Sequence, residues 1–328
     1  MSDTVAFDAM RDALRGAERL LLVTHEHPDG DALGSLIGMH GVLTALGKDA
    51  VMFVAPEEFP LPYEYDWLEH HDIVTTVPAD AAERTIVFLD CGSIDRNPAD
   101  GVRCPGATLL NIDHHHDNTR FGTLNLVVED ASCTAEIVWT LAHALDVGLT
   151  RRVAEALYVG LITDTGRFMY ENTGAPAHEM AAELIEAGVD VAFVYRRVYE
   201  GWPEPKLHLV ARALSRTERF GDGRLTFAHL FADDFAQTAA LDSHTEGIVD
   251  MLRSVDGTKV AGLARQHSGT AAGQWKVSLR ASDDDIDVSA IARAGGGGGH
   301  RAAAGFTTAL GPAELAAFLD EQIAAQQS

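Results

Sequence analysis

The sequence predicts an α/β fold, with a doubly wound, mainly parallel sheet in a first domain and a second, smaller α+β domain after it. Apolar runs of strand length alternate with helical patterns through the first half of the chain, as a parallel sheet with crossover helices requires. Polar residues directly follow several of these runs, at the edge where open α/β sheets bind ligands. The length of 328 residues favours two domains over one.

The expected elements of the first domain alternate between the two types. In chain order they are a helix at 5–17, a strand at 19–24, a helix at 32–46, strands at 51–55, 85–89 and 109–112, and helices at 132–146 and 151–163. Ser132 is the expected N-cap of the helix at 132–146. Asp164 follows the last of these helices directly.

The pattern changes after about residue 188, where helices are expected at 190–200 and 204–217 before a Gly-Asp-Gly turn at 221–223. The later elements are expected to be strands at 225–230, 260–266 and 275–280 and helices at 289–294 and 312–326. We therefore divide the chain into a first domain at 1–190, a helical linker at 191–220 and a second domain at 221–328.

The composition limits the partners and the compartment that we expect. A net charge of −24 repels polyanions and argues against binding of long nucleic acid, although a small phosphate ligand held locally is compatible with it. Three widely spaced cysteines indicate a reducing compartment. The N-terminus has no secretory pattern, and no segment approaches the ~20 apolar residues of a membrane span. We expect a soluble, cytoplasmic protein without membrane association.

Potential metal ligands follow the expected strands of the first domain. They are His25, Asp29 and Asp31 after the first strand, Asp90 after the run at 85–89, Asp113, His114 and His115 after the run at 109–112, and Asp164. Carboxylates with a few imidazoles suit Mn²⁺ or Mg²⁺ better than a structural zinc. The set predicts a two-metal hydrolase site in which Asp90 is the candidate bridging carboxylate.

Each ligand group alone has a simpler interpretation. The segment at 25–31 has the composition of a polar turn. Asp90 directly follows a predicted strand and could simply cap its end, and Asp164 could belong to a polar turn at the end of a helix. The histidines at 114–116 could be a surface tract. Because all four groups are expected at one edge of the sheet, a metal site is the favoured interpretation of the set.

A glycine run, Gly295–Gly299, precedes His300 and Arg301 in the second domain. Such a run can be a flexible linker. A linker is disfavoured here, because the run lies between a predicted helix and a stretch of small residues that ends at Gly305-Phe306. Phosphate binding is favoured instead, since glycines such as Gly297, Gly298 and Gly299 let backbone amides approach a phosphate closely. Arg280 is a possible phosphate contact or an ordinary exposed arginine.

These motifs resemble the DHH phosphoesterases with a C-terminal DHHA1 domain, and most of all their NrnA-like branch, over about residues 15–310. The resemblance implies that His25, Asp29 and Asp90 hold one Mn²⁺ and that Asp31, Asp90, His114 and Asp164 hold the other. It implies a catalytic role for Asp90 as the bridging ligand, for His115 beside the reacting phosphate, and for Asp113, which would orient the metal-binding histidine. His27 and His116 are left outside the site.

The resemblance also assigns substrate binding to the second domain, through Arg280, Gly297, Gly298, Gly299, His300 and Arg301, with the active site in an interdomain cleft. The family commonly has four glycines before the histidine, where this chain has five. A homodimer is implied. A hydroxide bridging two Mn²⁺ ions, for which Mg²⁺ or Co²⁺ could substitute, would attack the phosphorus in line.

The expected substrates are very short RNA, dinucleotides such as pApA, which would yield AMP, and 3′-phosphoadenosine-5′-phosphate, which would yield AMP and phosphate. The alternatives are a cyclic-dinucleotide phosphodiesterase and a non-catalytic nucleotide sensor. The C-terminal glycine-histidine pattern argues against a family II inorganic pyrophosphatase, and the length of 328 residues argues against a RecJ-type exonuclease. The sequence leaves the natural substrate and the direction of RNA degradation open.

Overall fold

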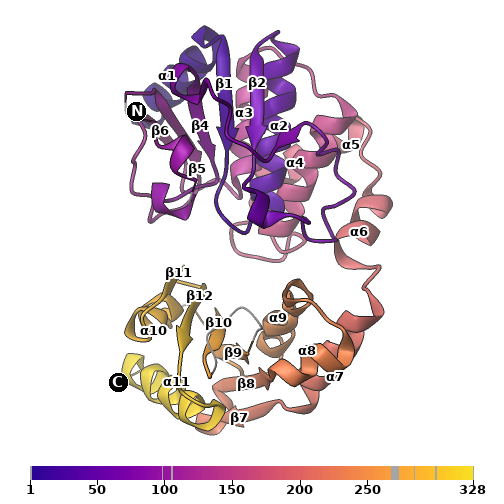
Figure 1. Ribbon diagram of the computed structural model, residues 1–328, viewed down its shortest axis with the longest axis vertical. Coiled ribbons are helices and arrows are strands. Elements are labelled where there is room, and N and C mark those ends of the chain that lie inside the picture. The colour runs from indigo at the N-terminus through magenta and orange to yellow at the C-terminus, as the bar shows by residue number, and fades with distance from the viewer. Residues whose placement is uncertain are drawn as a thin grey trace. The chain divides into compact units, whose positions relative to one another are not determined.

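The computed structural model describes residues 2–97, 99–104, 106–266, 273–283, 285–299 and 301–327. Two units divide the chain, Met1–Gly201 and Trp202–Ser328 (Figure 1). The division falls inside the segment 191–220, in which the sequence places the linker. Within the described residues, no helix combines the length and the apolar character that crossing a membrane requires.

The first unit contains a six-stranded sheet in which all neighbouring strands are parallel. Its strands are β1 (Arg19–Val23), β2 (Asp49–Phe53), β3 (Ile73–Val74), β4 (Thr85–Leu89), β5 (Leu109–Asp113) and β6 (Leu124–Val127). The order β3-β2-β1-β4-β5-β6 shows that the chain runs outward from β1 to β3 and then returns to β4 on the other side of β1. The strand order therefore reverses between β1 and β4, which is where open α/β sheets form ligand sites.

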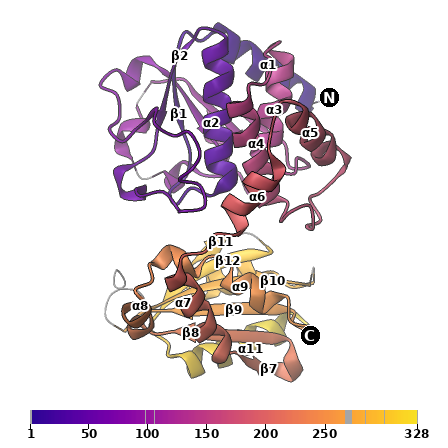
Figure 2. The same cartoon turned by 90° about the vertical axis from the view of Figure 1, so that its right-hand side faces the viewer.

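Both faces of this sheet are covered, but by different kinds of structure. Leu20 and Leu22 of β1 belong to the large cluster that includes the helices, while Leu21 and Val23 belong to a smaller cluster on the other face. The helices are α1 (Ser2–Gly16), α2 (Gly30–Ala45), α3 (Thr134–Ala144), α4 (Arg151–Asp164), α5 (Ala175–Glu186) and α6 (Val191–Tyr199). Figure 2 shows α2 to α5 on one side of β1 and β2. Loops and short 3₁₀ turns cover the opposite face, contributing residues such as Ala81 and Val102.

A stripe of glycines lets α2 pack closely against α4. A Cβ atom on Gly34 would lie 2.4 Å from the carbonyl oxygen of Ala156, and one on Gly38 would lie 2.5 Å from the Leu157 side chain. Both distances are shorter than real Cβ contacts allow. The close approach matters for function, because α2 begins beside Asp29 and Asp31 whereas α4 ends at Asp164.

The second unit contains a mixed six-stranded sheet in the order β11-β12-β10-β9-β8-β7. Among the pairings of the described residues, β8 and β9 are parallel and the other four pairs are antiparallel. The strands are β7 (Glu218–Phe220), β8 (Leu225–Leu230), β9 (Val260–Arg265), β10 (Trp275–Ala281), β11 (Gly298–Gly299) and β12 (Ala303–Thr308). Helices α10 (Val288–Ala294) and α11 (Pro312–Gln326) contribute to the core on one face, whereas α7 (Glu204–Ser215), α8 (Ala232–Thr238) and α9 (Ile248–Arg253) contribute to the core on the other.

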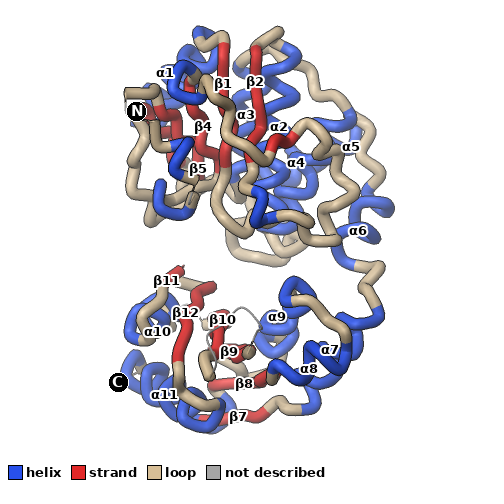
Figure 3. Tube along the Cα trace, in the orientation of Figure 1, coloured by secondary structure: helices blue, strands red, loops and turns tan. Residues whose placement is uncertain are grey.

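The predicted α/β class is confirmed, and Figure 3 shows helices and strands in both units. Most of the predicted elements lie within one or two residues of the observed ones. Sequence analysis missed α5, β6 and β12, together with the shorter β3, β7, α8, α9 and β11. The predicted N-cap at Ser132 is wrong. Helix α3 begins at Thr134 after Cys133, and the Ser132 hydroxyl and backbone N–H instead donate to Glu136, at 2.5 and 3.1 Å.

Candidate metal centre

The predicted ligands of the first unit lie at the carboxyl edge of its sheet, on both sides of the point where the strand order reverses. His25 follows β1, Asp90 follows β4, and β5 ends at Asp113, directly before His114 and His115. The other three ligands come from helix ends. Asp29 is the N-cap of α2, Asp31 lies in the first turn of that helix, and Asp164 is the last residue of α4.

Three overlapping groups of possible ligand atoms occur among the described residues. They are His25, Asp29 and Asp90; Asp31, His114 and Asp164; and Asp90, His114 and His115, with the atoms of each group within 4.8 Å of one another. The fold thus brings together all six residues that the sequence predicts as metal ligands. His27 is in none of these groups, and its exposed ring contacts Glu58 instead.

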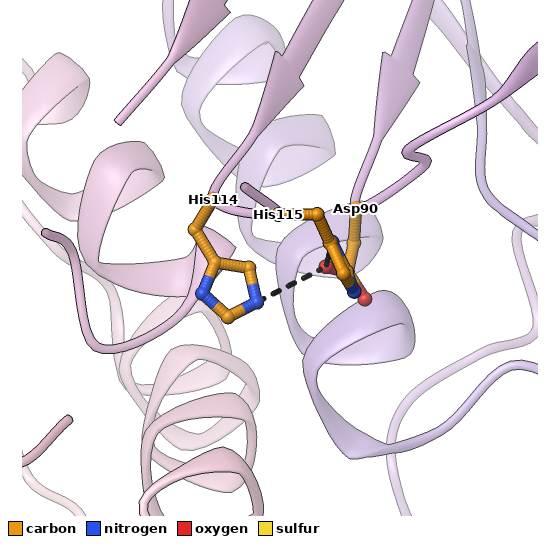
Figure 4. Close-up of side chains that lie close together, drawn as sticks. All are labelled: Asp90, His114 and His115. Atoms are coloured by element: carbon orange, nitrogen blue, oxygen red, sulfur yellow. Dashed lines mark ion pairs between the residues drawn. The ribbon is translucent and has the colours of Figure 1, made fainter. Parts of the chain in front are cut away.

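Asp90 connects the groups because its two carboxylate oxygens face different histidines. Its Oδ2 lies 3.5 Å from Nε2 of His25, and its Oδ1 lies 3.8 Å from Nε2 of His114. Figure 4 shows Asp90 and His114 facing each other from the ends of neighbouring strands. The backbone of Asp90 is in the left-handed region, with φ of 55°, an unfavourable conformation for a residue other than glycine. Such conformations persist where the surrounding structure requires them, as at functional sites.

Backbone carbonyls orient the two histidines. His25 directs Nδ1 to the carbonyl oxygen of Glu26 at 2.6 Å, and His114 directs Nδ1 to that of Ala131 at 3.4 Å. If each Nδ1 carries the proton, the corresponding Nε2 has a lone pair directed at the carboxylates. This is the tautomer that a metal ligand needs.

The partner of Asp113 is His115 rather than the metal-binding histidine to which the resemblance assigns it. Oδ1 of Asp113 lies 2.6 Å from Nδ1 of His115, and its Oδ2 accepts a hydrogen bond from Asn118. Burial lowers the pKa of His115, but the hydrogen bond to Asp113 and the charge of Asp90 outweigh it and raise the pKa to about 10. Asp113, which is fully buried, therefore favours the protonated form of His115.

Sequence analysis missed the residues that hold the carboxylates in place. The backbone N–H groups of Thr134 and Ala135, at the start of α3, donate to Asp31 at 2.6 and 2.9 Å. The Thr134 hydroxyl donates to Oδ1 of Asp90 at 3.0 Å. A helix N-terminus stabilises negative charge, so α3 orients both carboxylates. A threonine at a helix start is the only signal for this role in the sequence.

The aspartates at the centre have few cationic partners. Burial raises the pKa of Asp31 and of Asp164, and the charge of Asp90 raises both further. Burial acts on Asp90 in the same direction, but the hydrogen bond to His25 and the charges of the histidines make its pKa lower than usual. Within the described ranges, no Lys or Arg forms an ion pair with these three aspartates. A divalent cation at this position would favour the charged form of each carboxylate.

The residues predicted to bind substrate lie in the second unit. Gly297 and Gly299 pack against β12, where a Cβ atom would lie 2.1 Å from the carbonyl oxygen of Gly305 and 2.6 Å from Cα of Ala304, respectively. Close packing therefore explains these two glycines without a ligand. Gly298 faces open space. His300 lies outside the described residues, and Arg301 is exposed in the segment before β12. Arg280, on β10, lies 3.6 Å from Asp250.

Comparison with known proteins identifies both halves of the chain. Residues 19–161 match the N-terminal domain of the DHH family, and residues 235–327 match the DHHA1 domain. The chain is 35% identical over 290 residues to the bifunctional oligoribonuclease and PAP phosphatase NrnA of Thermus thermophilus, covering 88% of this chain and 83% of that protein. It is 28% identical over 303 residues to the probable bifunctional oligoribonuclease and PAP phosphatase NrnA of Streptococcus mutans, covering 92% of this chain and 93% of that one.

Solved structures share the fold. An exopolyphosphatase-related protein from Bacteroides fragilis superimposes with a TM-score of 0.87 at 23% identity, covering 98% of this chain and 96% of the other. The exonuclease RecJ bound to manganese superimposes with a TM-score of 0.51 at 16% identity, covering 100% of this chain and 94% of the other. These likenesses extend over both units and are consistent with the family matches.

Proposed function

The chain belongs to the DHH family, and we propose that it is a metal-dependent phosphoesterase that hydrolyses very short RNA and dinucleotides such as pApA, with 3′-phosphoadenosine-5′-phosphate as a second substrate. The observation that carries this proposal is the carboxylate of Asp90, whose two oxygens face His25 and His114 separately. A carboxylate in that position can bridge two cations. The names of the NrnA relatives in Thermus thermophilus and Streptococcus mutans support the choice of substrates.

The donor atoms fit two divalent ions. Carboxylate oxygens with imidazole nitrogens suit Mn²⁺ or Mg²⁺, and neither Cys91 nor Cys133 is in a ligand group. Repulsion among the buried aspartates would be relieved by bound cations. In the proposed arrangement His25, Asp29 and Asp90 would hold one Mn²⁺, while Asp31, Asp90, His114 and Asp164 would hold the other.

When bound, the two ions supply the activation of a water molecule and offset the negative charge that develops on the phosphate. The side chains around them fix the geometry. Thr134 and the start of α3 orient Asp90 and Asp31, and backbone carbonyls orient His25 and His114. The hydrogen bond to Asp113 orients His115 and favours its protonated form, which would donate to a phosphate oxygen or to the leaving nucleoside oxygen.

The second unit would bind the remainder of the substrate. Unlike Gly297 and Gly299, Gly298 faces open space, so its backbone is accessible to a phosphate. The side chain of Arg280 contacts Asp250 but is still 27% exposed, so a ligand can reach it. We propose these two residues, with Arg301 and His300, as contacts for the substrate away from the hydrolysed bond.

A turnover assay tests the proposal directly. Protein treated with chelator is incubated with and without Mn²⁺ against pApA, 3′-phosphoadenosine-5′-phosphate, a cyclic dinucleotide and a long single-stranded RNA, and release of AMP is followed. Mn²⁺-dependent AMP from the first two substrates, with the long RNA spared, is the expected result. Faster hydrolysis of the cyclic dinucleotide would make that compound the main substrate. Binding without turnover of any of the four would indicate the sensor instead.

Two further expectations belong to this proposal. The three free cysteines are compatible with a cytoplasmic location, where thiols stay reduced. A homodimer follows from the family resemblance, and sedimentation of the purified chain would test it.

A further inference from the structure

We propose that Arg96 binds a non-bridging oxygen of the phosphate that undergoes hydrolysis, and so supplies a cation from the protein next to the metal ions. Sequence analysis did not single out this residue. The inference rests on the proposed phosphoesterase function and adds a catalytic residue to it.

The backbone of Arg96 is attached to the loop that carries His25. Arg96 ends a 3₁₀ turn, Ile94–Arg96, and its carbonyl oxygen accepts a hydrogen bond from the N–H of Glu26 at 2.7 Å. The next residue, Asn97, donates from its side chain to the carbonyl oxygen of Thr24, also at 2.7 Å. The turn therefore keeps a fixed position beside the first group of metal ligands.

The side chains of Arg96, which belongs to this turn, and of Arg103, which contacts it, differ in their partners. The guanidinium of Arg103 is engaged through both terminal nitrogens: Nη2 donates to the carbonyl oxygens of Ile94 and Asn97 at 2.9 and 3.0 Å, and Nη1 pairs with Asp95 at 3.1 Å. The part-buried side chain of Arg96 has no hydrogen bond or ion pair to any residue in the described ranges. Stability of the turn thus explains Arg103 and leaves the guanidinium of Arg96 without a structural role.

The guanidinium of Arg96 lies within electrostatic reach of the metal centre. Its positive charge acts to lower the pKa of His25, Cys91 and His115, which come from three different segments around the centre. Although acidic residues surround the centre, none of them forms an ion pair with Arg96 within the described part of the chain.

A phosphate ligand matches an arginine in this position. The planar guanidinium can donate to two phosphate oxygens at once and stays charged at any working pH. During hydrolysis, charge is spread over the non-bridging oxygens of the phosphate, and a donor already held in place stabilises it. Because hydrogen bonds with Glu26 and from Asn97 hold the backbone of the 94–97 turn, phosphate binding would have to order only the side chain of Arg96.

The test uses inorganic phosphate as a probe, so that it does not depend on knowing the natural substrate. Equilibrium dialysis measures the binding of radiolabelled phosphate to the Mn²⁺-loaded wild-type chain and to the R96A and R96K variants. We expect R96A to weaken phosphate binding by at least ~10-fold with unchanged Mn²⁺ affinity, and R96K to retain part of the binding. With pApA as substrate, kcat/KM of R96A should fall by ~10²–10³-fold, with partial recovery when ethylguanidinium is added.

Two control variants separate phosphate binding from a structural role. R120A removes an exposed arginine that contacts only Glu129, at 3.5 Å, among the described residues, and it should bind phosphate as the wild type does. R103A removes the arginine that stabilises the turn, so it should lower the melting temperature. Wild-type phosphate affinity in R96A would overturn the inference, as would a fall in melting temperature and Mn²⁺ affinity equal to that of R103A. If the wild type fails to cleave pApA while R96A still binds phosphate more weakly, the proposed function fails and the role of Arg96 survives.

Discussion

Asp234 in the second unit and Asp31, Asp90 and Asp164 in the first are acidic residues in very different surroundings. Asp234 is 2% exposed, and its carboxylate accepts hydrogen bonds from Arg212, Arg216 and the backbone N–H of Phe231. The three aspartates of the first unit face histidines, backbone amides and one another, and within the described residues no Arg or Lys pairs with them.

The pKa values follow this difference. Burial raises the pKa of Asp234, but the hydrogen bonds from Arg216, Phe231 and Arg212 outweigh it and lower the pKa to about 2. At Asp31 and Asp164, burial and the neighbouring charge of Asp90 both raise the pKa. Arginines of the chain thus neutralise the structural carboxylate Asp234, and histidines balance the charge of Asp90. At Asp31 and Asp164 the balance is left to an external cation.

The largest effect should come from the D90N variant. Asparagine keeps the shape of the side chain but removes the negative charge that faces both His25 and His114. Turnover of pApA should fall by more than ~10³-fold, about 4 kcal/mol of transition-state stabilisation. The melting temperature without metal should change little, because the change removes repulsion from Asp31 and Asp164 but also the attraction of the histidines to Asp90. Near-normal turnover in D90N would refute the bridging role.

The D234A variant should have the opposite profile. It leaves the guanidinium groups of Arg212 and Arg216 without their buried partner, which should cost about 3 kcal/mol of unfolding free energy. The neighbouring exposed Asp233 supplies a matched control, since D233A should change stability by less than ~0.5 kcal/mol. Urea denaturation measures both variants. An equal loss in both would show that Asp234 has no special structural role.

Binding of Mn²⁺ should stabilise the chain by about 2.7 kcal/mol at a free concentration of 100 times the dissociation constant. Calorimetry with added Mn²⁺ or with chelator would measure this shift. We expect D234A to keep the full increment, because its carboxylate is not in any of the metal-ligand groups. D31N should lose most of it, since Asp31 is in one of them. The same increment in both variants would place the metal elsewhere.

The metal centre was easier to predict than its supporting residues. His25, Asp90 and the segment beginning at Asp113 each follow an apolar strand, and parallel strands bring such positions to one edge. Thr134 and Arg96 carry no comparable signal. Thr134 reaches Asp90 across 44 positions of sequence. That Arg103, and not Arg96, donates to the carbonyl oxygens of the turn among the described residues can be seen only in the structure.

The missed elements also have physical reasons. Strand β12 reads Ala-Ala-Gly-Phe-Thr-Thr, and because its first three residues are small, the β-branched and aromatic pattern that indicates a strand covers only its last three. Its place in the sheet comes from pairing with β10 on one side and with Gly298 and Gly299 on the other. Glycine has no side chain that indicates a strand, so the glycine run was predicted to bind phosphate and no strand was predicted within it. Helix α5 did carry a signal, with Pro176 near its start and Met180 and Leu184 four residues apart.

The smallest predicted effect is the pH dependence of the second unit's stability. The pKa of Asp234 is about 2 in the folded chain, below its ordinary value of 3.8. Stability from its charged form is therefore fully present above about pH 4 and is lost as the pH falls through 2. The loss should be about 2 kcal/mol, and the D234N variant should lack it because asparagine does not titrate. Urea midpoints of the wild type and D234N between about pH 5 and pH 2 measure the difference; parallel curves would show that another group carries the acid sensitivity.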